Sequence, residues 1–488
     1  MAKQLILAAT LAAALSACSM APTYERPQNP VSVDFPQGEA YGTASAPAAT
    51  AQKQTLAADI GWHDFFADAR LQKLIEIALV NNRDYRVATL QVEKARAQYQ
   101  IQRADLFPTV NAAAGQSRSH TPADLSSTGT QFTGGSYSAG LGFTAYELDL
   151  FGRVQSLKNE ALESYFSTAE AQRASQITLV SEVASQYLTL LAAQEQLQLA
   201  QDTLSSYQHT LDLTQKRFDV GASSAIELAV AQTQVNTAQG SVASSTLQAA
   251  QAENGLVLLI GEPLPAQLPA AQTLGTQGLL TDLPAGVPSD LLERRPDILQ
   301  AEHTLKAANA DIGAARANFF PRITLTGSYG TSSAELGNLF KAGQTAWSFA
   351  PSITLPIFDA GRNKATLDVS TTSEKIAVAQ YEKSIQSAFR EVSDALAARN
   401  MLDLQINAQQ ALVKSETTRY DLSTLRFTKG VDSYLAALDA QRSLFTAEQN
   451  LITLRLSRLT NLVTLYKVLG GGWVAQTGET PLSPGAAS

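Results

Sequence analysis

The chain repeats itself after about 210 residues, and this repeat is the feature that most restricts its fold. Phe107-Pro108 recurs as Phe320-Pro321, 213 residues later, and Gly152-Arg153 recurs as Gly361-Arg362, 209 residues later. Further matches at the second offset pair Arg217-Phe218, Gly221 and Ala231-Gln232 with Arg426-Phe427, Gly430 and Ala440-Gln441. The first copy therefore carries four extra residues between Pro108 and Gly152, where we expect an exposed loop.

The repeat predicts two similar units in tandem. The first spans residues 61–265 and the second spans residues 290–473, with a connector at 266–289 between them. Residues 18–60 are rich in Ala, Pro, Thr and Gln and show no sustained period, so we expect a linker there. Residues 474–488 have a similar composition and are expected to form a flexible C-terminal tail.

Proline-free stretches predict long helices in both copies. No proline occurs from Ala123 to Glu262 or from Ile357 to Thr480. Residues 154–218 fit one helix of about 98 Å, at about 1.5 Å per residue. Its seam alternates spacings of four and three, which is typical of helices that supercoil against neighbours. The seam comprises Ala193, Leu197, Ala200, Leu204, Tyr207, Leu211, Thr214 and Phe218, and in the second copy Ile406, Val413, Tyr420 and Phe427.

Each long helix is expected to end at a glycine and to be followed by a returning helix. Gly221 and Gly430 stand just after the predicted helix ends, and glycine is the usual left-handed residue at a helix C-terminus. These glycines therefore mark the tips of two helical hairpins. The other predicted helices are residues 226–260 and 433–468, which return from the tips, and residues 64–106 and 297–318, which precede the strand regions.

The hydrophobic period changes to two in the β-hairpins predicted at about 108–150 and 321–358. Apolar positions alternate with small or polar ones along Tyr137–Ala145, Ile323–Tyr329 and Trp347–Ile357. Strands of this kind suit a barrel whose outer face meets lipid. A half-buried hairpin of a soluble protein shows the same period, so the pattern alone leaves both interpretations open.

Four strands cannot close a barrel, and lipid does not tolerate an open sheet edge. Membrane-spanning strands would therefore require several chains, because bacterial barrels contain at least eight strands. Two chains would supply eight strands and three chains would supply twelve. The sequence does not choose between these numbers.

The N-terminus carries the features of a secreted lipoprotein. Lys3 precedes a short apolar run, Leu5 to Leu15, which is typical of a signal peptide over residues 1–17. Leu15-Ser-Ala-Cys18 resembles the bacterial lipobox, which predicts a covalent lipid on Cys18. Cys18 is the only cysteine of the chain, so it cannot form an intramolecular disulfide. Ser19 follows it, a residue that in bacterial lipoproteins implies sorting to the outer membrane. The alternative is a cysteine that stands by chance beside an ordinary cleavage site.

Composition argues against nucleic-acid binding, metal binding and catalysis. The formal charge is −8, which gives no electrostatic basis for binding nucleic acid. The four histidines do not pair at metal-ligand spacing, and no phosphate loop or nucleophile elbow is present. We therefore expect no enzyme activity, no metal and no cofactor apart from the lipid. The four histidines are His63, His120, His209 and His303.

Over residues 15–473 the chain resembles the outer-membrane efflux proteins of the TolC/OprM type, in their lipoprotein branch. The motifs that carry the resemblance are Gly61-Trp62, Leu292-Glu-Arg-Arg-Pro-Asp297, Phe319-Phe-Pro321, Phe358-Asp-Ala-Gly-Arg362, Gly430-Val-Asp-Ser-Tyr-Leu435 and Leu438-Asp-Ala-Gln-Arg442. The resemblance implies a mixed fold, in which long helical hairpins form a periplasmic α-barrel and four transmembrane strands per chain contribute to an oligomeric outer-membrane β-barrel. It also implies a homotrimer, a periplasmic adaptor protein at the hairpin tips and an inner-membrane efflux transporter.

The resemblance further implies a periplasmic gate near the hairpin tips. By position, Asp432 matches an acidic ring residue and Glu227 an acid of the first hairpin, and Arg217 and Arg426 are near enough to pair with acids in a closed state. The copies differ, since Ser223 stands where Asp432 stands in the second copy. Asp432 has a second interpretation as a helix cap, and the two arginines have one as solvated helix ends. Gly221 and Gly430 mark the predicted adaptor contact.

The implied function is a passive, gated duct that exports drugs, solvents or similar small molecules through the outer membrane of a Gram-negative bacterium. The duct would be lipid-anchored and would extend far into the periplasm. A coiled-coil envelope scaffold lipoprotein is one alternative, although it would leave the strand pairs at equivalent points of the repeat unexplained. The outer-membrane duct of a type I protein secretion system is another.

Overall fold

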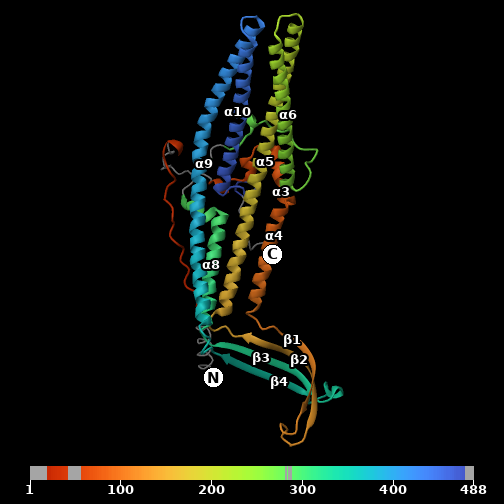
Figure 1. The fold of residues 1–488 in the computed structure, drawn as a ribbon. Coiled ribbons are helices and arrows are strands. Elements are labelled where there is room, and N and C mark those ends of the chain that lie inside the picture. The colour runs from red at the N-terminus through yellow and green to blue at the C-terminus, as the bar shows by residue number, and fades with distance from the viewer. Residues whose placement is uncertain (1–18, 42–55, 281–282, 284–287, 479–488) are drawn as a thin grey trace. The chain divides into compact units, whose positions relative to one another are not determined.

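A computed structural model describes residues 19–41, 56–280, 283 and 288–478 (Figure 1). The predicted signal peptide and Cys18 lie outside the described residues. By its internal contacts the chain forms two compact units. The first contains residues 1–28, 91–168 and 300–381, and the second contains residues 29–90, 169–299 and 382–488.

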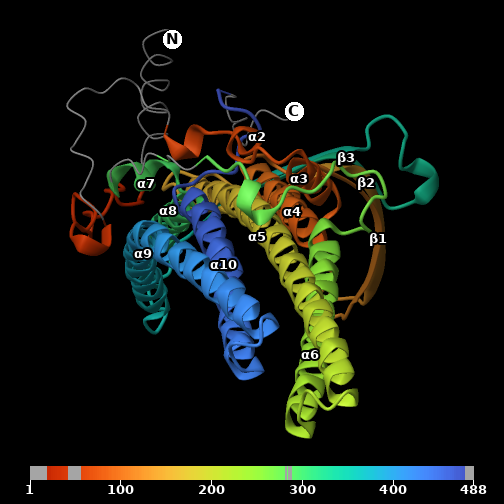
Figure 2. The same cartoon turned by 90° about the horizontal axis from the view of Figure 1, so that it is seen from above.

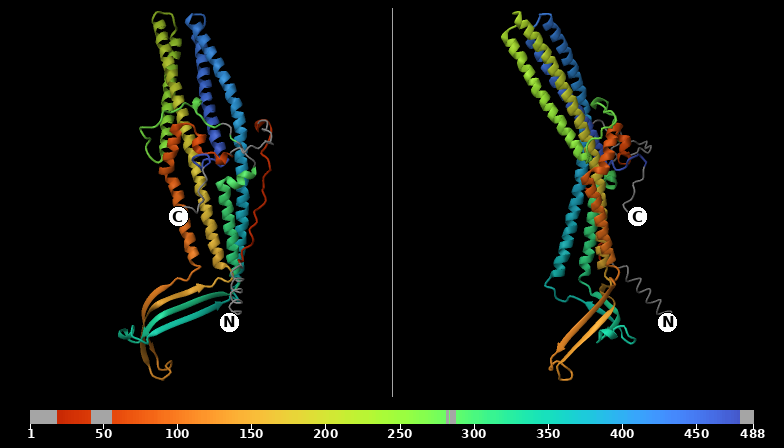
Figure 3. Two further views of the ribbon diagram at one scale, coloured as in Figure 1. Left: turned by 180° about the vertical axis from the view of Figure 1, so that it is seen from behind. Right: turned by 90° about the vertical axis from the view of Figure 1, so that its right-hand side faces the viewer.

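Helices account for most of the described chain, and the two copies of the repeat match closely. The two longest helices, α5 and α9, each contain 67 residues. The helices of the hairpins are α5 (Arg153–Asp219), α6 (Ala225–Ile260), α9 (Arg362–Thr428) and α10 (Tyr434–Val468) (Figure 3). The shorter helices are α2 (Trp62–Phe65), α3 (Ala69–Asn81), α4 (Arg83–Ala104), α7 (Pro288–Arg294) and α8 (Pro296–Ala317). Four 3-10 turns are η1 (Glu39–Tyr41), η2 (Ala57–Asp59), η3 (Leu274–Thr276) and η4 (Leu336–Asn338).

The single helix predicted over residues 64–106 is wrong, because three helices occupy this range. Asp68 begins α3 by accepting the amide of Arg70. Asn82 then interrupts the helix with an extended backbone, and its side chain accepts the amide of Tyr85 at 2.8 Å. The same side chain donates to the carbonyl of Leu259 at 2.9 Å. Asn82 therefore caps α4 and joins the break to α6.

Aspartates also begin the two longest helices. Asp149 accepts the amides of Arg153 and Gln155 at 2.7 and 2.8 Å. Asp359 accepts the amides of Gly361 and Asn363 at 2.9 and 2.8 Å. These carboxylates satisfy amides that have no partner within their helices and place negative charge at the positive end of each helix dipole.

In the second unit, aromatic side chains gather where α2 meets α10. Phe65 stacks on Tyr466 with ring centroids 4.0 Å apart, and the Tyr466 hydroxyl donates to the carbonyl of Ile60 at 2.6 Å. The C-terminal segment runs alongside, since the amide of Trp62 donates to the carbonyl of Val474 at 3.1 Å. The segments before α2 and after α10 therefore share one core.

Arg295, from the Leu-Glu-Arg-Arg-Pro-Asp motif, links three helices of this unit. Its guanidinium is almost fully buried and forms ion pairs with Asp297 of α8 at 2.6 Å and with Glu391 of α9 at 2.8 Å. It also donates to the carbonyl of Val468, the last residue of α10, at 3.1 Å. A buried arginine needs such partners, because the charge is otherwise costly to remove from water.

Both hairpin tips turn at the glycines identified in the sequence. Gly221 and Gly430 have φ of 73° and 72°, the left-handed conformation that a side chain disfavours. The amide after each glycine donates back into the long helix, from Ala222 to Arg217 at 2.7 Å and from Val431 to Arg426 at 2.9 Å. The two tips therefore close by the same hydrogen bonds, as is typical of a glycine C-cap (Figure 2).

The strands form one antiparallel sheet in the order β1-β2-β3-β4. The expected four strands are confirmed, two from each copy. Neither β1 nor β4 has a second strand partner among the described residues, so both outer edges of the sheet are open. The strands are β1 (Asn111–Thr121), β2 (Phe132–Glu147), β3 (Arg322–Ser333) and β4 (Thr345–Thr354).

The sheet register locates the four extra residues of the first copy. Asn111 pairs with Gly142, and Thr324, 213 residues after Asn111, pairs with Ser352. Ser352 lies 210 residues after Gly142, so three extra residues fall in the loop between β1 and β2. The fourth lies in a β-bulge between Phe143 and Tyr146, where Ala145 has φ of 53°.

The glycine requirement at the tips can be tested with a matched pair of substitutions. Gly430→Ala should destabilise the second hairpin tip by about 1 kcal/mol, because alanine is strained at positive φ. Gly240→Ala is the control, since Gly240 is exposed within α6 and has open space around it. It should stabilise α6 by about 0.5 kcal/mol. Hydrogen exchange of the two hairpins measures both effects, and equal shifts would contradict the assignment.

Candidate functional site

The sheet has one apolar and one polar face. Leu141, Tyr329 and Trp347 follow one another across β2, β3 and β4 on the same face, and their side chains are 57%, 67% and 74% exposed. On the opposite face, serine hydroxyls pair across neighbouring strands. The pairs are Ser117 with Ser136 at 3.0 Å and Ser328 with Ser348 at 2.7 Å. A sheet with large exposed apolar side chains on one side and hydroxyls on the other suits a boundary between lipid and water.

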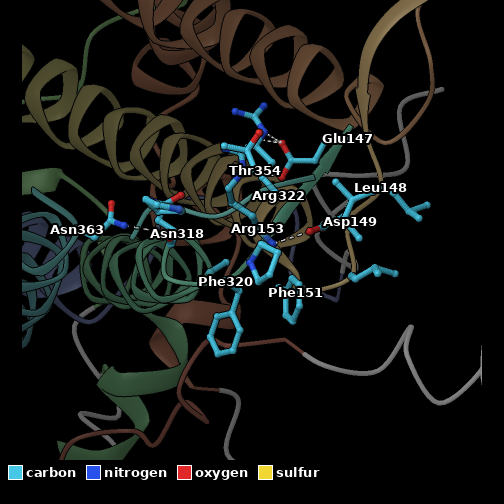
Figure 4. Close-up of a pocket in the computed structure, with 15 residues that line it drawn as sticks. Glu147, Leu148, Asp149, Phe151, Arg153, Asn318, Phe320, Arg322, Thr354 and Asn363 are labelled. Atoms are coloured by element: carbon cyan, nitrogen blue, oxygen red, sulfur yellow. Dashed lines mark hydrogen bonds and ion pairs between the residues drawn. The ribbon is translucent and has the colours of Figure 1, made fainter. Parts of the chain in front are cut away.

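Where the strands meet the helices, charged groups hold the two copies together. Glu147 at the end of β2 accepts from Arg153 of α5 at 2.7 and 2.8 Å and pairs with Arg322 at the start of β3 at 2.6 Å (Figure 4). Phe151 stacks on Phe320 beside them, with ring centroids 4.8 Å apart. We call these five residues the junction cluster.

A cavity of about 250 Å³ opens at the junction cluster. Figure 4 shows Asn318, Thr354 and Asn363 in its lining, together with the side chains of the cluster. The two arginines are already neutralised by Glu147 and by the nearby Asp149, so the cavity offers little net charge to a ligand. We interpret it as part of the connection between sheet and helices.

The first described residues form an extended strap along α8, in the first unit. Glu302 of α8 is 2% exposed and holds the strap. Arg26 donates to its carboxylate at 2.8 and 3.2 Å, and the Tyr24 hydroxyl donates at 3.2 Å. Lys306, one turn further along α8, pairs with it at 3.1 Å. Burial alone would raise the pKa of Glu302, but the hydrogen bonds from Arg26 and Lys306 outweigh burial and lower it.

Nearer the N-terminus, the strap approaches the end of α8 that leads into β3. The carbonyl of Pro22 accepts from Asn309 at 2.9 Å, and the carbonyl of Met20 accepts from Arg316 at 3.3 Å. Gly313 lets the strap lie close, since a Cβ on it would be 2.7 Å from the amide nitrogen of Ala21. The residue after Cys18 therefore belongs to a docked segment, and the sequence showed no signal for this contact.

At the second hairpin tip, Asp432 and Arg426 form an ion pair. The Arg426 Nη2 lies 3.2 Å from Asp432 Oδ1, and the Nε donates to the other carboxylate oxygen. The N-cap of α10 is Ser433, not Asp432, so the structure does not support the helix-cap interpretation of Asp432. The hydrogen bond from Arg426 lowers the pKa of Asp432 below its ordinary value of 3.8. The pair is therefore intact above that pH and is lost only as the pH falls through the lowered pKa.

The first tip is organised differently. Glu227 accepts the hydroxyl of Ser223 at 2.5 Å and forms a capping box with Ser224, so it begins α6. These hydrogen bonds, from Ser223 above all, lower the pKa of Glu227. Arg217 lies over the ring of Phe427, 5.1 Å from its centroid. The structure thus brings Asp432 and Arg426 together, whereas Glu227 and Arg217 have separate partners.

Behind the tips, the two hairpins pack on each other through a core that the seam only partly predicted. Phe427 and Tyr434 lie with ring centroids 5.4 Å apart, and burial raises the pKa of Tyr434 to about 12. Phe218 of the predicted seam is 39% exposed, whereas its counterpart Phe427 is 9% exposed. The core comprises Tyr207, Ala231, Val235, Ala238, Phe427, Tyr434, Ala437 and Leu438.

Searches of the described residues for two other kinds of site gave negative results. No group of three His, Cys, Asp or Glu side chains is arranged to hold a metal ion in the part of the chain that the structure describes. Across the same residues, no helix combines the length and the apolar character needed to cross a membrane.

Comparisons with known proteins agree with the fold. A family model described as outer membrane efflux protein matches residues 74–262 and 287–471. The toluene efflux pump outer membrane protein TtgC and the antibiotic efflux pump outer membrane protein ArpC, both of Pseudomonas putida, are each 49% identical over 479 residues, 98% of either chain. The crystal structure of the open state of the Neisseria gonorrhoeae MtrE outer membrane channel is 41% identical. It superposes with a TM-score of 0.85 and covers 95% of this chain and 100% of that one.

The ion pair at the second tip predicts opposite effects for its two partners, if it lies at the gate. Asp432→Ala should raise the conductance and lower cation selectivity, because it leaves Arg426 unneutralised. Arg426→Ala should raise cation selectivity, because it leaves the carboxylate of Asp432 exposed. Reversal potentials in planar bilayers under a salt gradient measure both effects. Ser223→Ala, at the equivalent position of the first copy, is the matched control. Unchanged conductance and selectivity in both variants would remove Asp432 from the gate.

Proposed function

Because the chain belongs to the outer membrane efflux protein family, we propose that it is the outer-membrane channel of a tripartite efflux pump, a passive duct for small molecules. The amphipathic four-stranded sheet with two open edges is the observation that carries this proposal. One chain exposes an apolar face and two unpaired strand edges. In lipid such a sheet is stable only when further strands complete a barrel.

The helical part of the fold supports the same function. Two antiparallel hairpins with long helices and glycine tips belong to the same chain as the sheet. The family consists of transport ducts, and this agrees with the expectation that the chain is not an enzyme. A coiled-coil scaffold would need neither the apolar sheet face nor the paired serines on the opposite face.

We assign the number of chains and the partners on the basis of the relatives. Three chains would supply twelve strands and six helical hairpins. The relatives are named as outer membrane components of pumps, which supports a periplasmic adaptor and an inner-membrane transporter as partners. The adaptor contact would lie at the tips around Gly221 and Gly430. Toluene and antibiotics, named for the relatives, make small apolar compounds the first substrates to test.

The lipid on Cys18 is a separate part of the proposal. Met20 and Pro22 are hydrogen-bonded to the last turns of α8, shortly before β3 begins at Arg322. An acyl chain on Cys18 would therefore start beside the strand end of the helices, where a membrane leaflet is expected. No other cofactor is proposed.

The channel function has a direct electrical test. The detergent-extracted protein should migrate as an oligomer that heating dissociates, and it should produce discrete conductance steps in planar bilayers without an energy source. A monomer that gives no conductance would contradict the proposal. Conductance without increased drug or toluene tolerance, when the matching pump partners are co-expressed in a host that lacks its own channel, would favour the secretion alternative.

Acylation can be tested separately from channel formation. Radioactive palmitate should label the wild-type protein, and Cys18→Ala should abolish the label, because the chain has no other cysteine. Ser19→Ala is the control, since it keeps the thiol and should retain the label. Label remaining in Cys18→Ala would show that the lipid is attached elsewhere.

A further inference from the structure

The repeat specifies how the two open edges of the sheet can pair. Inside one chain, β2 of the first copy pairs with β3 of the second copy, and we call this contact the in-chain seam. The equivalent contact joins β4, the second strand of copy two, to β1, the first strand of copy one. These two strands lie at opposite edges of one sheet. The equivalent contact therefore needs a second copy of the chain.

We propose that β4 pairs antiparallel with β1 of a second copy in one defined register, with Ile353 opposite Ala114. This inter-chain seam rests on the proposed channel function, because only an oligomeric barrel requires it. It goes further by naming the residues of each copy that meet. The partner is another copy of this chain, since its edges are related by the same repeat that builds the in-chain seam.

The register follows from the repeat offsets on the loop side of the β2 bulge. Phe143 pairs with Gly327 in the in-chain seam. Their counterparts are Ile353, 210 residues after Phe143, and Ala114, 213 residues before Gly327. The first offset comes from the strand pairing, and the second also relates the hydrogen bonds that end the preceding helices. Phe107 donates to Ala104 at 2.9 Å, as Phe320 does to Ala317 at 3.1 Å.

The offsets on the helix side of the bulge give the same register. Tyr146 pairs with Leu325 in the in-chain seam. The 209-residue offset, fixed by Gly152-Arg153 and Gly361-Arg362, places Leu355 opposite Ala112 of the second copy. This pair is two residues along each strand from Ile353 and Ala114. Two separate offsets therefore agree, and the inter-chain seam needs no bulge.

The in-chain seam also supplies a template at the strand ends. The amide of Leu148 donates to the carbonyl of Ile323 at 2.9 Å. Their counterparts are Ile357 and Val110, so the amide of Ile357 should donate to the carbonyl of Val110 in the second copy. Both side chains lack cover in one chain, at 93% and 62% exposed. The seam would bury this apolar pair.

The faces of the sheet exclude a slip by one residue. In the proposed register, Ile353 and Leu355 of β4 meet Ala114 and Ala112 of β1, which share the apolar face with Leu141. A slip by one residue would place the apolar row of β4 beside the polar row of β1. A slip by two would keep the faces matched but break the agreement of the offsets. The test must therefore separate registers that differ by two residues.

The two seams would differ in strength. Glu147 and Arg322 form an ion pair beside the in-chain seam, whereas the counterparts Pro356 and Thr109 carry no charge. Hydrogen bonding in β3 alternates, with Ile323 bonded to the β2 side and Ser332 bonded to Gln344 on the β4 side. By this alternation Pro351 faces the open edge of β4. Proline has no amide hydrogen, so the inter-chain seam would lack one ladder hydrogen bond.

Cysteine pairs test the register. Ser117 and Ala350 stand opposite each other in the proposed seam, at a position where the strands exchange no hydrogen bonds and side chains lie closest. The double variant Ser117→Cys with Ala350→Cys should form disulfides between copies on mild oxidation in membranes. Covalent oligomers should then appear on denaturing gels and disappear with reductant.

Matched pairs separate this register from its neighbours. Ser117→Cys with Ser348→Cys and Ser117→Cys with Ser352→Cys shift the pair by two residues and replace equally small side chains. Cross-linking should be at least tenfold slower in both, because diagonal Cβ atoms lie about 7 Å apart and a disulfide needs about 4 Å. Ser328→Cys with Ser348→Cys fixes the oxidation conditions, since these hydroxyls are 2.7 Å apart within one chain.

The outcomes distinguish the register from the channel function. Heat-sensitive oligomers and bilayer conductance are measured on the same samples. If they are present and a shifted pair cross-links faster, or no inter-chain pair cross-links while the in-chain pair does, the register is wrong and the channel function stands. If the wild type gives neither oligomer nor conductance, the channel function fails first.

Discussion

Unpaired strand edges are the constraint on which the rest of this structure depends. Every residue at an open edge carries an amide and a carbonyl that need partners, and lipid offers none. One chain contributes four strands and leaves both outer edges open. The fold is therefore complete only as an assembly, and the helical hairpins, repeated within each chain, are multiplied by the same assembly that closes the sheet.

Much of this fold could be predicted from the sequence, because the repeat made each observation checkable at a second site. The glycine tips, the long helices and the four strands all recur at fixed offsets. The break at Asn82 was missed, since the helical period continues through it and the cause is a hydrogen bond to Leu259, 177 residues away. The bulge at Ala145 was hidden within the four extra residues, because sequence spacing does not separate a bulge from a longer loop.

The candidate gate was harder to predict than the fold. Position along the repeat gave the correct neighbourhood of Asp432, but side-chain partners depend on distances of a few ångströms. Asp432 lies against Arg426, whereas Glu227 is used by Ser223 and Ser224 to begin α6. The junction cluster and the Glu302 site gave no signal at all, because Glu302 and Arg26 are 276 residues apart and neither lies in a periodic pattern. Repetition thus predicts backbone geometry well, and it predicts poorly where the copies have diverged.

The docked strap has a consequence for how a lipid anchor would act. A flexible linker leaves the distance between an acyl chain and its protein variable, so the lipid only limits diffusion away from the bilayer. Here the buried carboxylate of Glu302 and the carbonyls of Met20 and Pro22 hold the first described residues along α8. An acyl chain on Cys18 would then act as a depth gauge. It would fix the height of the last turn of α8 relative to the lipid headgroups before any strand had entered the bilayer.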